Sequence, residues 1–437
     1  MSPATTHPIA GIPRTVIAAT LLILGSEIAR SAQPAAVASV LNPVVTGPIA
    51  ATAAPGDPFH DYPFFSTPLD LASLGYVEEE YFIEGTASRY DIPATITLAN
   101  TPMTTASVIE SGVPYRTRMI VRRPASPDGF SGTVLMEWQN VTFGYDIDAG
   151  WLASSEHIMR RGYAWIGVSA QRVGVHSANG LRAWSPTRYG TLDLSAGGTR
   201  TDDSLQYDVF SQAAQAVRNP VGNDPMAGLE VKRIVAAGVS QGATRLVVYH
   251  NAVHPSAGVF DGFMPLLHGA RLRTDLEVKV FKVLSETDVW RDQVPYRQAD
   301  SDNFRRWEVA RAAHLDFRVE RQLLPMQMRD LGSAPQPTCT SPPFSRIPLA
   351  FAVDAALDHM VAWMNNGIAP PSGPDIETAG TPEVIARDGF GNALGGIRLS
   401  QHAVPTATNT GVNGPLTNAC RSAMTRSQRC TPTTARM

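Results

Sequence analysis

The sequence predicts a protein of the α/β class, in which helices flank a mostly parallel central sheet. Two observations carry this prediction. Strand-like apolar runs alternate with helix-like runs along the middle of the chain, and short connections join them. The β-branched run at residues 234–239 then passes through a Gly-x-Ser-x-Gly turn straight into a helix-compatible pattern. No repeat of fixed period is visible, so a solenoid is not expected.

The first half of the chain predicts an antiparallel edge followed by a parallel unit. Residues 76–90 alternate loosely between apolar and polar positions, as an edge strand does, and residues 115–122 predict a second strand. Residues 132–138 form a more apolar strand, a helix follows at about residues 151–161, and residues 163–170 predict the next strand. Strand, helix and strand with short connections are the unit of a parallel sheet.

Residues 171–201 interrupt this alternation with a long segment that is rich in Gly, Ser, Arg and Trp and has no clear period. In a compact domain so long a loop is more often a lid or a pocket wall than an idle connection. Residues 202–218 return to a helix with one apolar face, which leads into the strand at residues 234–239. The later elements are strands at residues 258–267, 276–284 and 304–309, a helix at residues 349–364, and a loop-rich tail at residues 372–437.

Charge and composition narrow the class of ligand. The chain has 36 basic and 39 acidic residues, a formal net charge of -3, and no block of like charges. Neither nucleic acid nor an anionic membrane surface is therefore expected as a partner. A small neutral or weakly charged molecule fits better, and 43% hydrophobic residues suffice for a substantial core. These patterns give no indication of an oligomeric state.

The N-terminal region differs from the rest of the chain. Residues 1–32 predict a secretory signal peptide, because Arg14 precedes the apolar run at residues 16–25 and small residues follow it. This run is too short to span a bilayer as a mature helix. Residues 33–58 are rich in Ala and Pro and predict a flexible linker. We therefore expect a periplasmic or secreted protein with a single domain at residues 59–437, tail included.

The three cysteines, Cys339, Cys420 and Cys430, all lie late in the chain. Three thiols cannot form a four-cysteine metal cage, and neither His-Glu-x-x-His nor a His/Asp cluster at ligand spacing occurs, so no metal is expected. In an exported protein, a disulfide from Cys339 to either of the other two would tie the tail to the body. No cofactor is expected, since the glycines at residues 391–396 lack the strand and helix of a dinucleotide cradle.

Ser240 is the candidate nucleophile. It lies between Gly238 and Gly242, after a strand and before the helical pattern at residues 243–249, which is the context of a nucleophile elbow. The elbow holds its serine in a strained conformation with the hydroxyl projecting, so that a Cβ on either side would collide with neighbouring backbone. An ordinary glycine-rich turn is the alternative interpretation of the same residues.

A serine hydroxyl needs a histidine to take its proton and a carboxylate to orient that histidine. In folds of this kind the chain order is serine, acid, histidine. The turn after the strand at residues 276–284 offers Asp288, which we prefer for its spacing, and Glu286 as the alternative. His314 follows the next strand and is the candidate base. Of the remaining histidines, His359 and His402 are weaker candidates for the base, His250 and His254 are expected to be structural, and His268 is a possible pocket residue.

Two further sets of residues are candidates around the nucleophile. The backbone N–H of Gln241 should donate to the oxyanion that forms on a substrate carbonyl, because it directly follows the serine. Asn140, in the polar loop after the strand at residues 132–138, is a candidate for the second donor or for the pocket wall, and a turn-forming asparagine is the alternative interpretation. Aromatic residues in or near the expected pocket loops are candidates for substrate contact, unless they belong to the core. They are Trp138, Tyr145 and Trp184, with Phe143 and Trp151 nearby.

With these residues identified, the chain resembles the α/β-hydrolase-domain family of exported bacterial proteins. The resemblance covers most of the chain after residue 58 and lies in residues 80–87, 118–124, 137–142, 238–242, 285–289, 307–309, 313–314 and 388–398. It implies an α/β-hydrolase fold with a triad of Ser240, His314 and one of the two acids. One residue departs from the expected pattern: Arg311 stands where a glycine is expected ahead of the histidine loop.

The resulting expectation is a secreted serine hydrolase that cleaves a small or medium-sized carboxylic ester through an acyl-enzyme. One alternative is an acyltransferase that uses the same triad. The other belongs to a different class, a non-catalytic exported binding protein built on a hydrolase fold. Reaction of Ser240 with a fluorophosphonate probe separates the two enzymes from the binding protein.

Overall fold

The structure is a computed structural model that describes residues 40–334, 344–381, 383–404, 408–411 and 423–425. The expected signal peptide at residues 1–32 and all three cysteines lie outside the described residues. Within the described part of the chain, no helix combines the length and the apolar character needed to cross a membrane.

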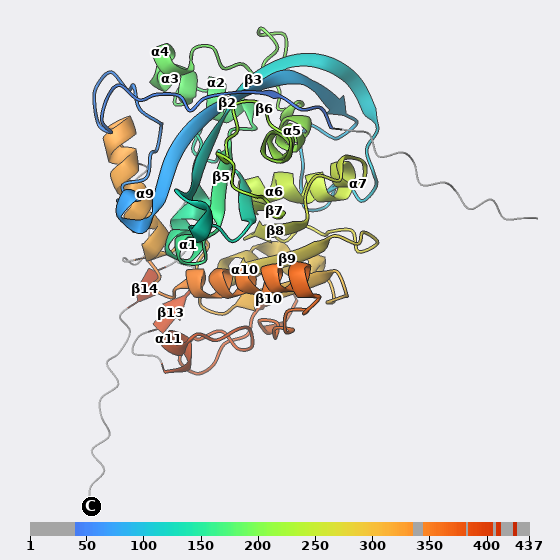
Figure 1. The fold of residues 1–437 in the computed structure, drawn as a ribbon. Coiled ribbons are helices and arrows are strands. Elements are labelled where there is room, and N and C mark those ends of the chain that lie inside the picture. The colour runs from blue at the N-terminus through green and yellow to red at the C-terminus, as the bar shows by residue number, and fades with distance from the viewer. Residues whose placement is uncertain (1–39, 335–343, 382, 405–407, 412–422, 426–437) are drawn as a thin grey trace, which may run out of the picture. The chain divides into compact units, whose positions relative to one another are not determined.

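A ten-stranded sheet forms the centre of the fold, in the order β10-β9-β8-β7-β4-β5-β3-β2-β1-β6 (Figure 1). The pairs from β10 to β5 are parallel, whereas β5, β3, β2 and β1 pair antiparallel, so the expectation of a mostly parallel sheet is confirmed. The strands are β1 (Val44–Thr46), β2 (Tyr76–Tyr90), β3 (Val108–Pro124), β4 (Thr133–Trp138), β5 (Ala164–Val168), β6 (Val221–Gly222), β7 (Arg233–Val239), β8 (Gly262–Leu266), β9 (Lys279–Ser285) and β10 (Phe304–Val309).

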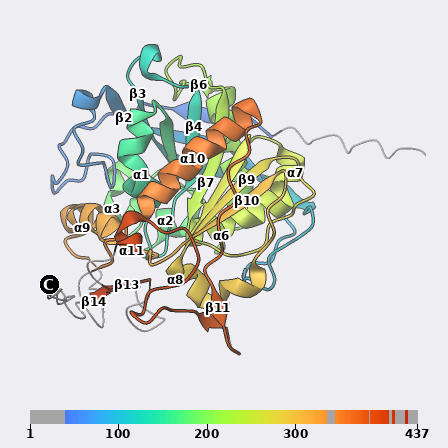
Figure 2. The same cartoon turned by 90° about the horizontal axis from the view of Figure 1, so that it is seen from below.

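Helices cover both faces of this sheet. One face packs against α1 (Ala149–Arg160) and α10 (Leu349–Asn366), and the other against α5 (Gln206–Arg218) and α6 (Gln241–Val248). Figure 2 shows α10 crossing the strands on its side of the sheet. The central strands read as continuous apolar runs because their side chains point alternately into these two cores. In β7, for example, Val235 faces the α10 side and Ala236 the α6 side.

The antiparallel part of the sheet is longer than the sequence pattern indicates. β2 and β3 form a long curved hairpin, visible as the blue and cyan strands of Figure 1. Beside it lie three short helices from the segment at residues 171–201, which the sequence suggests is a loop: α2 (Arg172–His176), α3 (Leu181–Trp184) and α4 (Pro186–Tyr189). Smaller elements are η1 (Ala72–Leu74), η2 (Pro127–Gly129), η3 (Tyr249–Val253), α7 (His254–Ala257), α8 (Glu286–Asp288), η4 (Val289–Gln293), η5 (Val294–Tyr296), α9 (Phe317–Leu331), β11 (Thr378–Ala379), β12 (Val384–Ile385), α11 (Ser400–Ala403), β13 (Thr408–Thr410) and β14 (Ala423–Thr425).

The prediction of a flexible linker at residues 33–58 is wrong for its described part. β1 pairs with β2 on one side and with β6 on the other, and Val45 is buried. The guanidinium of Arg188 donates to the carbonyl oxygens of Ile49 (3.0 Å) and Ala50 (2.9 Å). Backbone groups make these bonds, so an Ala- and Pro-rich composition does not reveal them. Residues 33–39 lie outside the described residues.

Candidate active site

Ser240 lies at the turn between β7 and α6, with φ 55° and ψ -112°. A side chain at either flanking glycine would collide with backbone. A Cβ at Gly238 would approach the carbonyl of Gly242 to 2.9 Å, and a Cβ at Gly242 would lie 2.4 Å from the carbonyl oxygen of Trp138. The glycine pattern therefore has the steric origin expected of an elbow, and the strained serine is held where a strand ends and a helix begins.

The structure brings Ser240, His314 and Asp288 into one hydrogen-bonded chain. The Nε2 of His314 lies 2.7 Å from the Oγ of Ser240, and its Nδ1 lies 2.7 Å from the Oδ1 of Asp288. Asp288 lies in α8, directly after β9, and His314 in the loop after β10, so two neighbouring parallel strands deliver the acid and the base beside the elbow. Both distances suit proton transfer between serine and imidazole.

Asp288, rather than Glu286, contacts the histidine. The other oxygen of Asp288 accepts hydrogen bonds from the backbone N–H (2.9 Å) and the hydroxyl (2.6 Å) of Ser285. Burial alone would raise the pKa of the Asp288 carboxyl, but the charge and hydrogen bond of His314, together with Ser285, hold this pKa below its usual value. The carboxylate is therefore ionised near neutral pH and fixes the orientation of the imidazole.

Glu286 instead ties the histidine loop to the tail of the chain. It is fully buried, and its carboxylate accepts hydrogen bonds from the N–H of Arg311 (2.7 Å), the guanidinium of Arg387 (2.7 Å) and the N–H of Gly411 (3.2 Å). Next to it, the hydroxyl oxygen of Thr287 accepts the N–H of His314 (3.1 Å) and its proton goes to the carbonyl of Gly411. The alternative acid thus has a positioning role in this geometry.

Arg311 has a positive φ of 64°, at the position where the family pattern leads one to expect a glycine. A positive φ is unfavourable for a residue with a Cβ, because the side chain crowds the following carbonyl. The backbone therefore takes the conformation that a glycine would favour, although the residue is an arginine. Its side chain is fully buried, and its N–H is fixed on Glu286.

The two expected oxyanion donors differ in their availability. Gln241 is the first residue of α6, so its backbone N–H has no acceptor within the helix. Asn140, in contrast, donates its backbone N–H to Ile147 (3.1 Å) and its side-chain amide to the carbonyl of Val239 (3.0 Å). The expectation of Asn140 as an oxyanion donor is therefore corrected, because its donors maintain the loop, whereas its expected place in the pocket wall is confirmed. The next N–H, of Val141, binds the side-chain oxygen of Gln241 at 3.2 Å.

A cavity of about 220 Å³ opens at Ser240 and His314. Its wall is mainly apolar and comes from the loop after β4, the ends of β7 and β8, the loop that carries His314, and helices α1, α9 and α10. The lining side chains include Phe143, Ile147, Val239, Leu266, Leu267, Val319, Leu323, Leu349 and Val353. No lysine or arginine is among the lining residues. The polar residues in the lining include Asn140, Thr142 and Asp316.

Of the aromatic residues expected in or near the pocket, Phe143 lines this cavity, whereas Trp138, Tyr145, Trp151 and Trp184 do not. Trp138 is fully buried and packs on Phe210, with ring centres 4.5 Å apart. Tyr145 is buried, and its hydroxyl accepts the side-chain amide of Gln327. Trp184 stacks on the imidazole of His60 at 4.4 Å. Large rings are drawn into the cores that support the site, so the predicted pocket roles of Trp138, Tyr145 and Trp184 are wrong.

The cavity wall comes mainly from residues that the sequence patterns do not single out. The segment at residues 171–201 contributes none of the lining residues, so it is no lid over this cavity. Residues of α9 and α10 form part of the cavity wall instead. The sequence patterns do not predict α9, because Pro325 lies inside it and a proline normally argues against a helix interior. The amphipathic pattern of Val319 and Leu323 is the signal that could have identified it.

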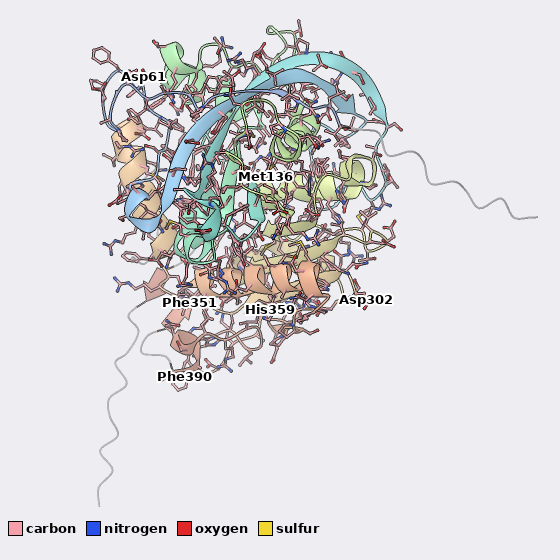
Figure 3. The ribbon with its side chains drawn as sticks, in the orientation of Figure 1. Asp61, Met136, Asp302, Phe351, His359 and Phe390 are labelled. Carbon is pink, nitrogen blue, oxygen red and sulfur yellow. The ribbon has the colours of Figure 1, made fainter. Side chains whose placement is uncertain are left out.

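The other histidines lie away from the hydrogen-bonded chain. His250 is fully buried and His254 is half-buried, at the end of the elbow helix, as expected. His359 lies on α10 (Figure 3), where its ring packs edge-on against Trp307. His402 is buried in α11, and His268 is not among the residues that line the cavity. Among the described residues, no three His, Cys, Asp or Glu side chains are grouped as a metal site requires.

Comparison with known proteins gives one family match. A family model described as an alpha/beta hydrolase domain matches residues 45–434. Among solved structures, a ferulic acid esterase from Streptomyces cinnamoneus aligns at 14% identity and a TM-score of 0.34, over 66% of this chain and 92% of its own. A serine hydrolase without a lid from Xanthomonas campestris aligns at 13% identity and a TM-score of 0.30, over 50% and 92% of the two chains. No curated protein matches the sequence.

Proposed function

Because the chain belongs to the alpha/beta hydrolase domain family, we propose that it is a serine hydrolase that cleaves a carboxylic ester. One observation carries the proposal: the unbroken chain of 2.7 Å contacts from Asp288 through His314 to the strained Ser240. An ordinary glycine-rich turn needs neither a histidine on its serine nor a buried carboxylate behind that histidine.

In the proposed reaction, the Nε2 of His314 takes the proton of Ser240 as the serine Oγ attacks the ester carbonyl. The N–H of Gln241 donates to the oxyanion that forms. His314 then donates this proton to the alcohol oxygen as the ester bond breaks. The alcohol departs, and the acyl group stays bound to Ser240 as an acyl-serine. Water attacks this acyl group while His314 again accepts a proton, and the carboxylic acid departs with Ser240 restored. Asp288 stays ionised throughout and stabilises the imidazolium.

The cavity favours a neutral substrate with an apolar group. No cationic side chain lines it, and the carboxylate of Asp316 is engaged with two N–H groups at the start of α9. An anionic group entering this wall would lose its hydration without gaining a cationic partner. An apolar cavity of roughly 150 Å³ accommodates benzene in an engineered protein. The cavity here, at about 220 Å³, suits an aryl group or a medium-length alkyl chain.

The primary test measures hydrolysis of p-nitrophenyl esters by the wild type and by Ser240→Ala, His314→Ala and Asp288→Asn. Members of a triad act as a unit, so we expect each of the first two variants to lose roughly 10³-fold or more in kcat. Labelling by a fluorophosphonate should disappear in Ser240→Ala. An inactive wild type whose serine stays unlabelled would instead indicate a binding protein.

A second test addresses the cavity. Val353→Phe places a ring in the wall, whereas Phe351→Ala changes the same helix on its exposed side (Figure 3). We expect Val353→Phe to lower kcat/KM for hexanoate relative to acetate by about tenfold or more, because pocket volume limits the longer chain. Phe351→Ala should leave the ratio unchanged. Equal ratios in all three proteins would mean that the substrate does not enter this cavity.

We also propose that the protein is exported, on the basis of the apolar run and small residues within residues 1–32. Expression of the full chain in a bacterium, followed by fractionation and N-terminal sequencing, tests this. A mature protein in the periplasm or medium that begins near residue 33 is the expected result. Full-length protein in the cytoplasm would contradict it.

A further inference from the structure

A second cavity, of about 580 Å³, lies within residues 171–201, the segment of α2, α3 and α4, which the proposed reaction does not use. Its lining is mostly polar and carries Arg172, Arg182 and Arg200 together with His176. Asp193 is the only carboxylate among the lining residues. The wall therefore holds three permanent positive charges against one negative charge, in a chain whose overall net charge is -3.

The single carboxylate binds its own loop, and its Oδ1 also lies 3.4 Å from the Nε2 of His176. The oxygens of Asp193 accept the N–H (2.7 Å) and the hydroxyl (2.5 Å) of Ser195 and the N–H of Gly197 (2.6 Å). Arg200 forms an ion pair with Glu110. The Nε atoms of both Arg172 and Arg200 are buried and lack a hydrogen-bond partner among the described residues, and Arg172 forms no ion pair there. A buried charged donor without an acceptor is costly, and an anion in the cavity would satisfy it.

His176 and Arg182 present two further donors to the same space. The N–H of Leu194 donates to the Nε2 of His176 (2.9 Å), so this nitrogen carries no proton in the neutral ring. Burial and the nearby charge of Arg182 lower the pKa of His176, which keeps the ring neutral at pH 7. Its proton is then on Nδ1, which lies 3.2 Å from the Nη1 of Arg182. Two donors thus face each other, and an acceptor oxygen beside them would bind both.

We propose that this cavity is a binding site for a small organic molecule with a carboxylate or phosphate group, held by Arg172, Arg182 and His176. Planar guanidinium groups donate pairs of hydrogen bonds to such oxyanions. The volume exceeds that of a bare ion, so the rest of an organic molecule fits beside its anionic group. The site is separate from the apolar cavity, which lacks cationic side chains.

The anion site adjoins the elbow through one pair of side chains. Gln171, which directly precedes Arg172, exchanges hydrogen bonds with Gln241: its amide donates at 3.2 Å and accepts at 2.6 Å. Gln241 in turn follows the proposed nucleophile and accepts the N–H of Val141. An anion bound by Arg172 therefore lies one residue along the chain from Gln171, and Gln171 contacts Gln241, the proposed oxyanion donor.

The test is a binding measurement that needs no ester substrate. Isothermal titration of the full chain with inorganic phosphate and with malonate, at constant ionic strength set by chloride, should give a Kd of roughly 1 mM or below for at least one of them. The stronger of the two identifies the phosphate or the carboxylate as the preferred group. Arg172→Gln combined with Arg182→Gln should weaken binding at least tenfold. The matched control is Arg233→Gln, which removes an arginine at the end of β7 opposite to Ser240. This variant should bind the anions as the wild type does.

A second measurement uses the wild type alone, in case the double variant does not fold. Phenylglyoxal modifies accessible arginines, and mass spectrometry of the peptides identifies which ones react. Phosphate or malonate should protect Arg172 and Arg182 but not Arg233. The proposal fails if neither anion binds the wild type above the chloride background, or if both the double variant and the protection pattern show no dependence on these two arginines.

Discussion

Arg311 shows, at the scale of one residue, how the histidine loop is held. A left-handed conformation costs a residue with a Cβ about 1 to 2 kcal/mol, and such strain persists where surrounding contacts fix it. Here the N–H of Arg311 is fixed on the buried carboxylate of Glu286, and three residues later His314 faces Ser240. The strained turn and the carboxylate therefore set the position of the imidazole together.

A matched pair of substitutions isolates this strain. Arg311→Gly and Arg311→Ala both remove the buried guanidinium, but the Ala variant retains the unfavourable positive φ. We expect the Gly variant to be more stable by about 1 kcal/mol in urea unfolding. The neighbouring Ala310 has no positive φ, so Ala310→Gly should lower stability instead. Equal stability of the two Arg311 variants would show that the loop relaxes.

Substitutions of the two acidic residues of α8 should affect different properties, activity for Asp288 and stability for Glu286. Asp288→Asn keeps the shape of the side chain but supports the wrong tautomer of His314, so we expect kcat to fall by about 10⁴-fold with little change in stability. Glu286→Gln leaves donors of Arg311 and Arg387 without a charged acceptor in a buried site, so stability should fall by about 1 to 3 kcal/mol. Activity and urea unfolding of both variants give the two readouts. The reverse pattern would exchange their roles.

Residue types alone predicted which side chains come together at the site better than they predicted its walls. Ser240, Asp288 and His314 were identifiable because an elbow requires flanking glycines and a fixed chain order. Trp138, Tyr145 and Trp184 were placed in the wrong environment, because aromatic character predicts burial and says nothing of which cavity a ring faces. Asn140 shows a similar limit: a polar residue at a strand end has donors, but only the fold determines what they bind.

At the scale of elements, the helical region after the elbow carries two histidines that make the fold sensitive to acid. Burial lowers the pKa of His250 to about 3 and that of His254 to about 4. In the unfolded chain a histidine titrates near 6.5. The unfolded state therefore binds more protons below this value, and stability present above about pH 6.5 is lost as the pH falls toward 4.

His254→Phe tests this assignment. The ring of His254 packs edge-on against Phe263 at 4.8 Å, and a phenyl ring retains this packing while removing the titrating nitrogens. We expect the wild type to lose about 2 to 3 kcal/mol more than the variant between pH 7 and pH 4, since each pKa unit corresponds to about 1.4 kcal/mol. Urea unfolding at several pH values measures the difference. Parallel stability curves would show that folding does not lower the pKa of His254.

α9 is a helix that the sequence patterns do not predict. Pro325 removes one N–H from the middle of this helix, which argues against a helix when the pattern is judged alone. The helix forms nonetheless because both ends are fixed: Asp316 caps its start, and near its end Asp330 binds the hydroxyl of Tyr62 (2.8 Å) and the N–H of Phe65 (2.9 Å). These partners lie 268 and 265 residues away in sequence, beyond the reach of local patterns.

At the scale of the whole sheet, the parallel centre was predictable and the antiparallel edge was only partly so. β4, β5, β7, β8 and β9 are buried on both faces, and such strands are recognisable as continuous apolar runs between helices. β1 has three residues and one buried side chain, and β6 has two exposed residues. Elements this short are defined by their hydrogen bonds to a neighbour, which composition does not encode.

This edge gives a prediction about where the fold begins. Starting the chain at residue 59 instead of residue 40 removes β1, and it leaves the buried side chain of Arg188 without the carbonyls of Ile49 and Ala50. Arg188 also pairs with the fully buried Glu80, so the loss reaches the β2 strand.

We expect the shorter chain to be less stable by at least about 3 kcal/mol, since it breaks a strand pairing and strips acceptors from a buried charge. Thermal and urea unfolding of the two purified chains measure this difference, and Arg188→Lys in the longer chain, which keeps the charge but not the planar fork, should give a smaller loss in the same direction. Equal stability of the two chains would restore the linker interpretation of residues 40–58 and place the start of the folded domain after them.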